Sequence, residues 1–191
     1  MLRGFLLGNV ITVLAIVGYG YFVVTSGDVP AGAANATPLP LERWAATTSL
    51  RANLARYAPK GANPVPLTEA NLLTGIDLYG RNCAICHGTG GGRASASPVA
   101  KGEYPKPPQF GSHPEMGSHS TADHPPEHSF WIIKYGIRLT GMPAWQGTLN
   151  DQEIWTVALF LSQMDRLPPA ARQAWQNLGK PQTGSVAMAR P

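Results

Sequence analysis

The sequence is poor in cysteine and in charge. Its 191 residues include two cysteines, Cys83 and Cys86, which are too few for a domain held together by several disulfides. Charged residues make up only 14% of the chain, and the 15 Lys and Arg form no dense basic run, so a net charge of +4 does not indicate a nucleic-acid-binding protein. We find no internal repeat. The length suits one compact domain with appendages.

A long uncharged stretch runs from Phe5 to Val24. As a helix, its twenty residues would extend roughly 30 Å, the thickness of the hydrocarbon core of a bilayer. We therefore predict a membrane anchor over residues 1–27 that contacts lipid. Arg3 precedes the span and Asp28 follows it, so the positive-inside rule places the start of the chain in the cytoplasm and everything after the anchor outside.

A cleaved secretory signal is the competing interpretation of this stretch, because Ala34-Asn35-Ala36 has the small-residue pattern of a cleavage site. The apolar run is longer than the roughly 7 to 15 residues of a usual signal core, and Ala36 lies twelve residues beyond its end. A buried core helix is the other alternative. The run is apolar around its whole circumference, which favours a membrane span.

The remaining chain is rich in glycine and proline and divides into three segments. Residues 28–66 are expected to form a tether, in which Leu41 to Tyr57 favours a short helix because three apolar side chains share one helical face. Residues 67–167 are expected to form the main domain. Residues 168–191, which follow Leu167 and begin with two prolines, are expected to form a C-terminal tail.

The main domain is predicted to be all-α. Thr68 opens a stretch with Leu72, Ile76 and Tyr79 at helical spacing, and Ser129 to Ile137 shows a similar apolar period. Asn150 followed by Glu153 resembles a capping box at the start of a last helix. The residues between the first two helices are dominated by Gly, Pro, Ser and His and predict a long wrapping loop.

Cys83-Ala84-Ile85-Cys86-His87 is a C-x-x-C-H pattern. In this pattern the two thiols add to the vinyl groups of haem as thioethers, and the adjacent imidazole ligates the iron. A thioredoxin-type redox pair needs a strand before the motif, whereas a helix is predicted here. A structural zinc site needs two more ligands, which only the downstream histidines could supply.

Met142 is the candidate for the second axial ligand. It lies in Thr140-Gly141-Met142-Pro143-Ala144-Trp145, where glycine permits a close backbone approach and proline fixes a turn. Haem iron with His on one side can take Met on the other. Met116, Met164 and Met188 are interpreted as packing or loop residues.

The stretch from about Thr68 to Leu167 resembles a class I c-type cytochrome of the bacterial membrane-anchored monohaem form, on the strength of residues 82–88 and 136–145. The resemblance implies three to five helices around one covalent haem c, with Cys83, Cys86, His87 and Met142 as the haem-binding residues. It also implies a one-electron carrier rather than an enzyme. Its location would be a bacterial inner membrane with the haem domain on the periplasmic side, and its partner a redox protein or membrane oxidoreductase complex of a respiratory or photosynthetic chain.

The resemblance assigns roles to further residues. Gly75 and Tyr79 would cross the last helix at Trp155 and Phe160, and the carbonyl of Pro107-Pro108 would orient His87. The departure from the family is a loop with four histidines, at positions 113, 119, 124 and 128, which we expect to be exposed to solvent or to face a partner. The alternative is that these histidines hold copper or zinc or provide a ligand in place of Met142. Two other functions stay open: a haem protein that binds small ligands or acts like a peroxidase, and a subunit that mainly docks a larger complex.

Overall fold

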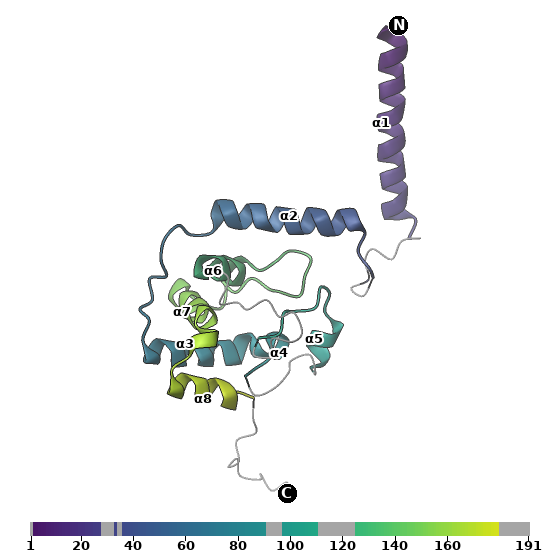
Figure 1. The fold of residues 1–191 in the computed structure, drawn as a ribbon. Helices are drawn as coiled ribbons and strands as arrows, with labels where there is room; N and C mark the ends of the chain where they lie inside the picture. Colours follow the sequence, from purple (N-terminus) through teal and green to yellow (C-terminus); the bar gives the residue numbers. More distant parts are fainter. Residues whose placement is uncertain (1, 28–32, 34–35, 91–96, 111–124, 180–191) are drawn as a thin grey trace, which may run out of the picture. The chain divides into compact units, whose positions relative to one another are not determined.

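The computed structural model describes residues 2–27, 33, 36–90, 97–110 and 125–179 (Figure 1). Every regular element in those ranges is a helix, so the predicted all-α class is confirmed. The chain falls into two parts, residues 1–43 and 44–191. We describe each part by itself.

The first part contains α1 (Leu2–Thr25), which confirms the predicted N-terminal apolar helix. Within it, Arg3–Thr25 has a mean hydropathy of 1.9, so α1 is long and apolar enough to cross a membrane. Three polar side chains of α1 bond to backbone carbonyls of the preceding turn, at 2.8 to 2.9 Å. These side chains are Asn9, Thr12 and Thr25. Such bonds satisfy polar groups without water, as a bilayer requires.

The helix expected between Leu41 and Tyr57 is present as α2 (Pro40–Tyr57), and none of its residues is buried. The chain packs into the domain core immediately after α2. Ala58 and Val65 are buried, and the side chain of Asn63 donates to the carbonyl of Trp155 at 3.0 Å. The last residues of the expected tether therefore pack with the domain.

The core is built on α7 (Asp151–Ser162), which packs against both α3 (Glu69–Asn82) and α6 (Pro126–Tyr135) (Figure 1). The predicted capping box at Asn150 is confirmed by two bonds, at 2.9 and 3.0 Å, that it exchanges with Glu153. The predicted start of α3 is confirmed too, because the side chain of Thr68 accepts from the N–H of Asn71 at 3.2 Å.

The crossing of α3 and α7 depends on Gly75. A Cβ atom at this position would lie 2.6 Å from the carbonyl oxygen of Thr156 and 2.8 Å from Cβ of Phe160. Tyr79 packs edge-on against Phe160, with ring centroids 5.5 Å apart. The expected contact of Gly75 and Tyr79 with Phe160 is thus present. The ring of Trp155 stacks instead on Phe130 of α6, at 4.2 Å between centroids.

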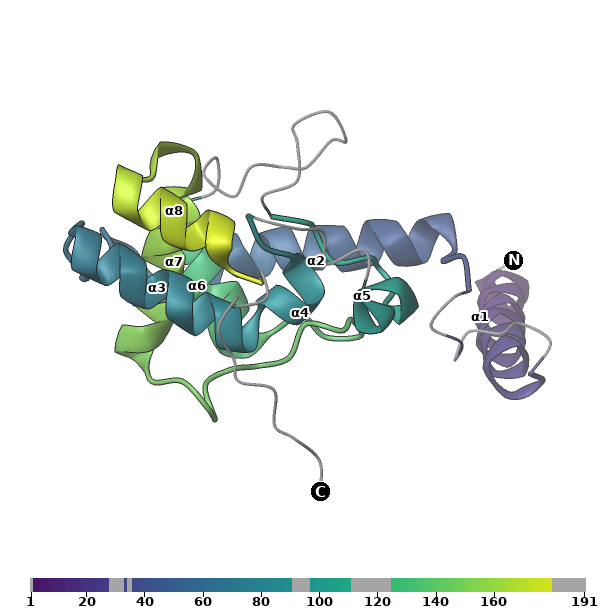
Figure 2. The same ribbon diagram turned by 90° about the horizontal axis from the view of Figure 1, so that it is seen from below.

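The chain continues beyond α7 through η4 (Met164–Arg166) into α8 (Pro169–Asn177). This helix lies beside α3 in both views (Figure 2). Ala171 and Trp175, four residues apart, are buried, so α8 adds to the core although it lies within the residues expected to form a tail. Two of the nine residues of α8 are buried, and a pattern this short cannot be recognised in the sequence from hydrophobic periodicity.

Candidate functional site

The C-x-x-C-H motif forms a single helical turn. α4 (Ala84–His87) follows Cys83 directly, and the N–H groups of Cys86 and His87 both donate to the carbonyl of Cys83, at 3.1 and 3.0 Å. Gly88 ends the turn with φ of +82°, a conformation that glycine adopts without strain. Residues three and four apart share a helix face, so the two sulfurs and the imidazole lie on one side of the turn.

The imidazole of His87 is held by residues 107–110. Its Nδ1 lies 2.8 Å from the carbonyl oxygen of Pro108. A carbonyl can only accept, so Nδ1 carries the proton and Nε2 has a free lone pair. The ring of Phe110 stacks on the imidazole, with centroids 4.8 Å apart and planes 3° from parallel. Of the two prolines expected to orient His87, it is Pro108 whose carbonyl bonds to the ring.

Two further bonds fix this segment along α4. The side chain of Gln109 donates to the carbonyls of Cys86 and Pro107, at 2.9 and 3.0 Å, and the N–H of Phe110 donates to the carbonyl of His87 at 2.8 Å. Burial lowers the pKa of His87, against the opposing effects of the Pro108 hydrogen bond and the nearby Glu103 carboxylate. The neutral imidazole, which is the form that can ligate a metal, is therefore favoured.

The two cysteines are thiols that are not joined in a disulfide. Burial raises the pKa of Cys83 to about 12. Burial, with a hydrogen bond to Glu103 as the second cause, raises the pKa of Cys86 to about 11. Both groups are protonated at neutral pH. That state does not suit a redox-active pair, in which one thiol pKa is lowered.

Met142 lies in a tight loop after α6. The loop is closed by the N–H of Ile137, which donates to the carbonyl of Met142 at 3.1 Å, and by Thr140, whose hydroxyl accepts from the N–H of Met142 at 3.1 Å. Met142 is partly buried and packs against the core. Gly136, with φ of +67°, leaves room for the loop, because a Cβ there would lie 2.7 Å from the carbonyl oxygen of Met142.

Glu103 lies beside both the cysteine motif and the Met142 loop. Its carboxylate lies 3.2 Å from Sγ of Cys86, and a Cβ added to Gly141 would lie 2.6 Å from its Cδ. Sequence reasoning did not single out Glu103, Gln109 or Phe110. No spacing rule marks them, since they act through contacts between segments that lie far apart along the chain.

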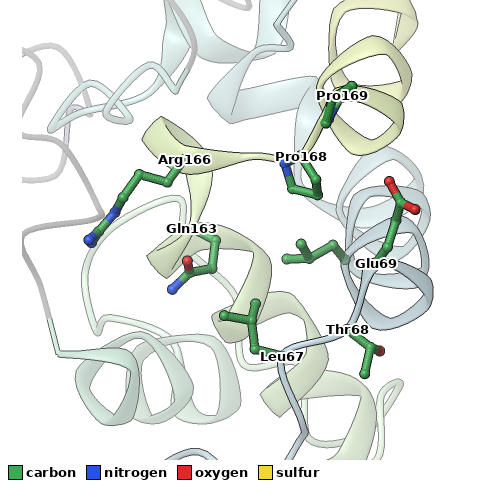
Figure 3. A pocket seen from close by; sticks show the side chains of 8 residues that line it. Leu67, Thr68, Glu69, Gln163, Arg166, Pro168 and Pro169 are labelled. Atoms are coloured by element: carbon green, nitrogen blue, oxygen red, sulfur yellow. The ribbon is translucent and has the colours of Figure 1, made fainter.

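The four-histidine loop falls mostly outside the described residues, which include only His128, on α6. Within the described ranges, no group of three or more His, Cys, Asp or Glu side chains could hold a metal ion. A separate hollow lies between the start of α3 and the segment leading into α8 (Figure 3). Thr68, Glu69 and Arg166 are among its lining residues, which include neither the motif nor Met142.

The donor set of this site fits a haem c. Two sulfurs and one imidazole share a helical turn, and the imidazole is fixed through Nδ1 with Nε2 free. A methionine lies in a loop that shares Glu103 as a neighbour with this turn. A thiol pair, an imidazole and a thioether are the protein groups that haem c uses.

Residues 70–161 match the family described as cytochrome C oxidase, cbb3-type, subunit III. No curated protein matches the chain. A chain of the reducing HAO-like protein complex of Kuenenia stuttgartiensis is similar at 21% sequence identity, with 73% of this chain and 72% of that chain covered. The TM-score of this match is 0.40. On the family match, residues 70–161 are a c-type cytochrome domain of the class I kind, a family whose cofactor is haem c.

Proposed function

We propose that this chain is a one-electron carrier with a single haem c, bound covalently by Cys83 and Cys86 and ligated by His87 and Met142. The observation that carries the proposal is the geometry of α4. One helical turn presents both sulfurs and an imidazole whose Nδ1 is already bonded to the carbonyl of Pro108 at 2.8 Å. The remaining nitrogen is therefore oriented for a metal.

Attachment of haem would start from protonated thiols, the form in which the protein holds both cysteines. Cys83 and Cys86 would each add S–H across one vinyl double bond, with the sulfur bonding to one vinyl carbon and the thiol hydrogen going to the other. The addition consumes no oxidant or reductant. It uses both cysteines of the chain, one for each vinyl group.

Haem c, when bound, supplies the one-electron couple. His87 and Met142 would both ligate the iron, which would leave no position for a substrate and favours electron transfer over catalysis. The core supports both ligands: Gln109 and Phe110 hold the turn that carries His87, and Gly136 and Thr140 hold the loop that carries Met142.

Cysteine variants test the attachment. The chain should be produced in a host with a haem c maturation system and analysed by intact mass and by haem retention under denaturing conditions. The parent should carry one haem that denaturation does not release. Cys83→Ala and Cys86→Ala should each retain a single link, and the double variant should release its haem. A parent whose haem is extracted freely would refute the covalent assignment.

We further propose that α1 anchors the chain in a bacterial inner membrane, with the haem domain on the periplasmic side. The hydropathy of α1 and its internally bonded polar side chains support the anchor. Arg3 at the start of α1 supports the orientation. The partner would be a redox protein or a membrane oxidoreductase complex. In this proposal the haem domain extends from Ala58 to Gly179, wider than the 67–167 of the sequence prediction, because Val65 and Trp175 belong to its core.

Replacing residues 1–27 by a cleavable signal tests the separation of anchor and domain. The product should be soluble and should carry haem, because the described haem-site contacts involve no residue of α1. A chain that is exported yet fails to mature without its own span would contradict the proposal.

A further inference from the structure

Glu103 lies between the two halves of the proposed haem site. On one side, its carboxylate oxygen accepts a hydrogen bond from Sγ of Cys86 at 3.2 Å. On the other, a Cβ added to Gly141 would lie 2.6 Å from Cδ and 2.8 Å from Oε1 of Glu103. The same carboxylate therefore bonds to a cysteine of the motif and lies beside Gly141, the residue before Met142.

The position of Glu103 is built into the fold. It directly follows α5 (Pro98–Gly102), whose Ala100 is buried. The hydroxyl of Ser97 caps α5 and also donates to the carbonyl of Ile85 at 2.8 Å, which ties α5 to the turn that carries the motif. Gly141 completes the arrangement, because any larger residue there would occupy the space of the Glu103 side chain.

Within the described part of the chain, no basic side chain is paired with Glu103. Among the described residues, its one hydrogen-bonding partner is the thiol of Cys86. A thioether has no hydrogen to donate, so attachment at Cys86 would leave the carboxylate beside the sulfur without that donor.

We propose that Glu103 lowers the reduction potential of the proposed haem site, by holding a carboxylate beside both Cys86 and the Met142 loop. A nearby anion stabilises the oxidised form, which carries one more positive charge than the reduced form. This inference rests on the proposed function, since it requires a haem at Cys86.

The test is the midpoint potential of haem-loaded variants, measured by optical redox titration. Glu103→Gln removes the charge at constant size and should raise the potential, whereas Glu103→Asp keeps the charge and should stay closer to the parent. Glu69→Gln is the matched control. It removes the same charge from an exposed residue roughly 20 Å along α3 from the motif, where it should have little effect. Equal potentials in Glu103→Gln and Glu69→Gln would overturn the proposal.

Gly141→Ala gives a second, independent test. Its added methyl collides with the Glu103 side chain, so it should displace the carboxylate and raise the potential in the parent. In a Glu103→Ala background the same substitution meets no carboxylate and should change the potential little. An equal shift in both backgrounds would show that Gly141 acts on Met142 without Glu103. Haem content is measured in every variant: a parent without covalent haem refutes the proposed function, whereas loaded variants with unchanged potentials refute only the role of Glu103.

Discussion

Nδ1 of His87 lies 2.8 Å from the carbonyl oxygen of Pro108, 21 residues further along the chain. This bond selects the tautomer that leaves Nε2 free and fixes the direction in which the ring points. The neighbouring residues secure it, because Gln109 bonds to the backbone of the motif and Phe110 stacks on the imidazole. The loop after the motif thus contributes directly to the site.

Gln109→Ala should loosen this segment. The side chain donates to the carbonyls of Cys86 and Pro107, and its removal leaves both without that donor. We expect a loss of about 1–3 kcal/mol in the free energy of unfolding, measured by denaturant titration. Gln146→Ala is the control, since Gln146 is exposed and its described bond uses only its backbone N–H. Equal losses in the two variants would contradict a role for Gln109.

Gly75→Ala should destabilise the domain by about 3 kcal/mol, because the new methyl group would meet the backbone of Thr156 and force α3 and α7 apart. The denaturation midpoint of the haem-loaded protein measures the effect. Gly102→Ala provides the comparison: it also places a methyl group on a helical glycine, but nothing lies within 4 Å of that position. If both variants unfold at the parent's midpoint, the helix crossing is not as close as described.

Tyr79→Phe should cost about 1–3 kcal/mol, because the buried hydroxyl donates to the carbonyl of Gly88 at 2.8 Å and its loss leaves that carbonyl unpaired. Burial raises the pKa of Tyr79 above its ordinary value, so the unfolded chain loses the phenol proton at a lower pH than the folded protein does. The contribution of Tyr79 to stability is thus complete below about pH 10 and declines as the pH rises beyond it.

Denaturant titrations at a series of pH values from neutral to alkaline check the Tyr79 prediction. The parent should lose more stability above about pH 10 than Tyr79→Phe, which has no phenol to titrate. Parallel pH profiles for the two proteins would show that Tyr79 ionises in the folded and unfolded states alike.

Truncation tests whether α8 belongs to the haem domain. Trp175 packs against Tyr79 and Phe160, at 5.3 and 5.2 Å between ring centroids, and a Cβ on Gly90 would collide with its indole. A chain ending at residue 167 should therefore lose about 3–5 kcal/mol of stability, as for the removal of a buried tryptophan. A chain ending at Gly179 keeps every described contact of α8 and should behave as the parent. Similar unfolding midpoints for the two chains would show that α8 is dispensable.

Sequence reasoning predicted the parts of the fold and site that depend on local pattern. Each of these features depends on residues close together in the sequence: the apolar span, the cap at Thr68, the capping box at Asn150 and the motif at Cys83 to His87. Glu103 could not be predicted, because its place depends on α5 and Gly141 meeting in space. The packing of α8 was missed for a similar reason, since Trp175 is buried by residues almost a hundred positions earlier.

The ligand role proposed for Met142 has a thermodynamic consequence. A thioether is a soft, neutral ligand that favours the reduced iron, so exchange for an imidazole should lower the potential. Met142→His should therefore keep its covalent haem, through Cys83, Cys86 and His87, while its midpoint potential falls well below that of the parent. Met164→Leu, which replaces a methionine packed against the core, should leave the potential unchanged. A Met142→His protein with the parent's potential would argue for a different ligand.

Carbon monoxide binding to the reduced, haem-loaded protein tests the His87/Met142 ligation most directly. If His87 and Met142 both ligate the iron, as proposed, the parent should show no spectral change with carbon monoxide. Met142→Ala should bind it, because the position opposite His87 is opened, and Met164→Leu should behave as the parent. Binding by the parent would indicate an open, ligand-binding haem, and failure of Met142→Ala to bind would show that Met142 is not the ligand.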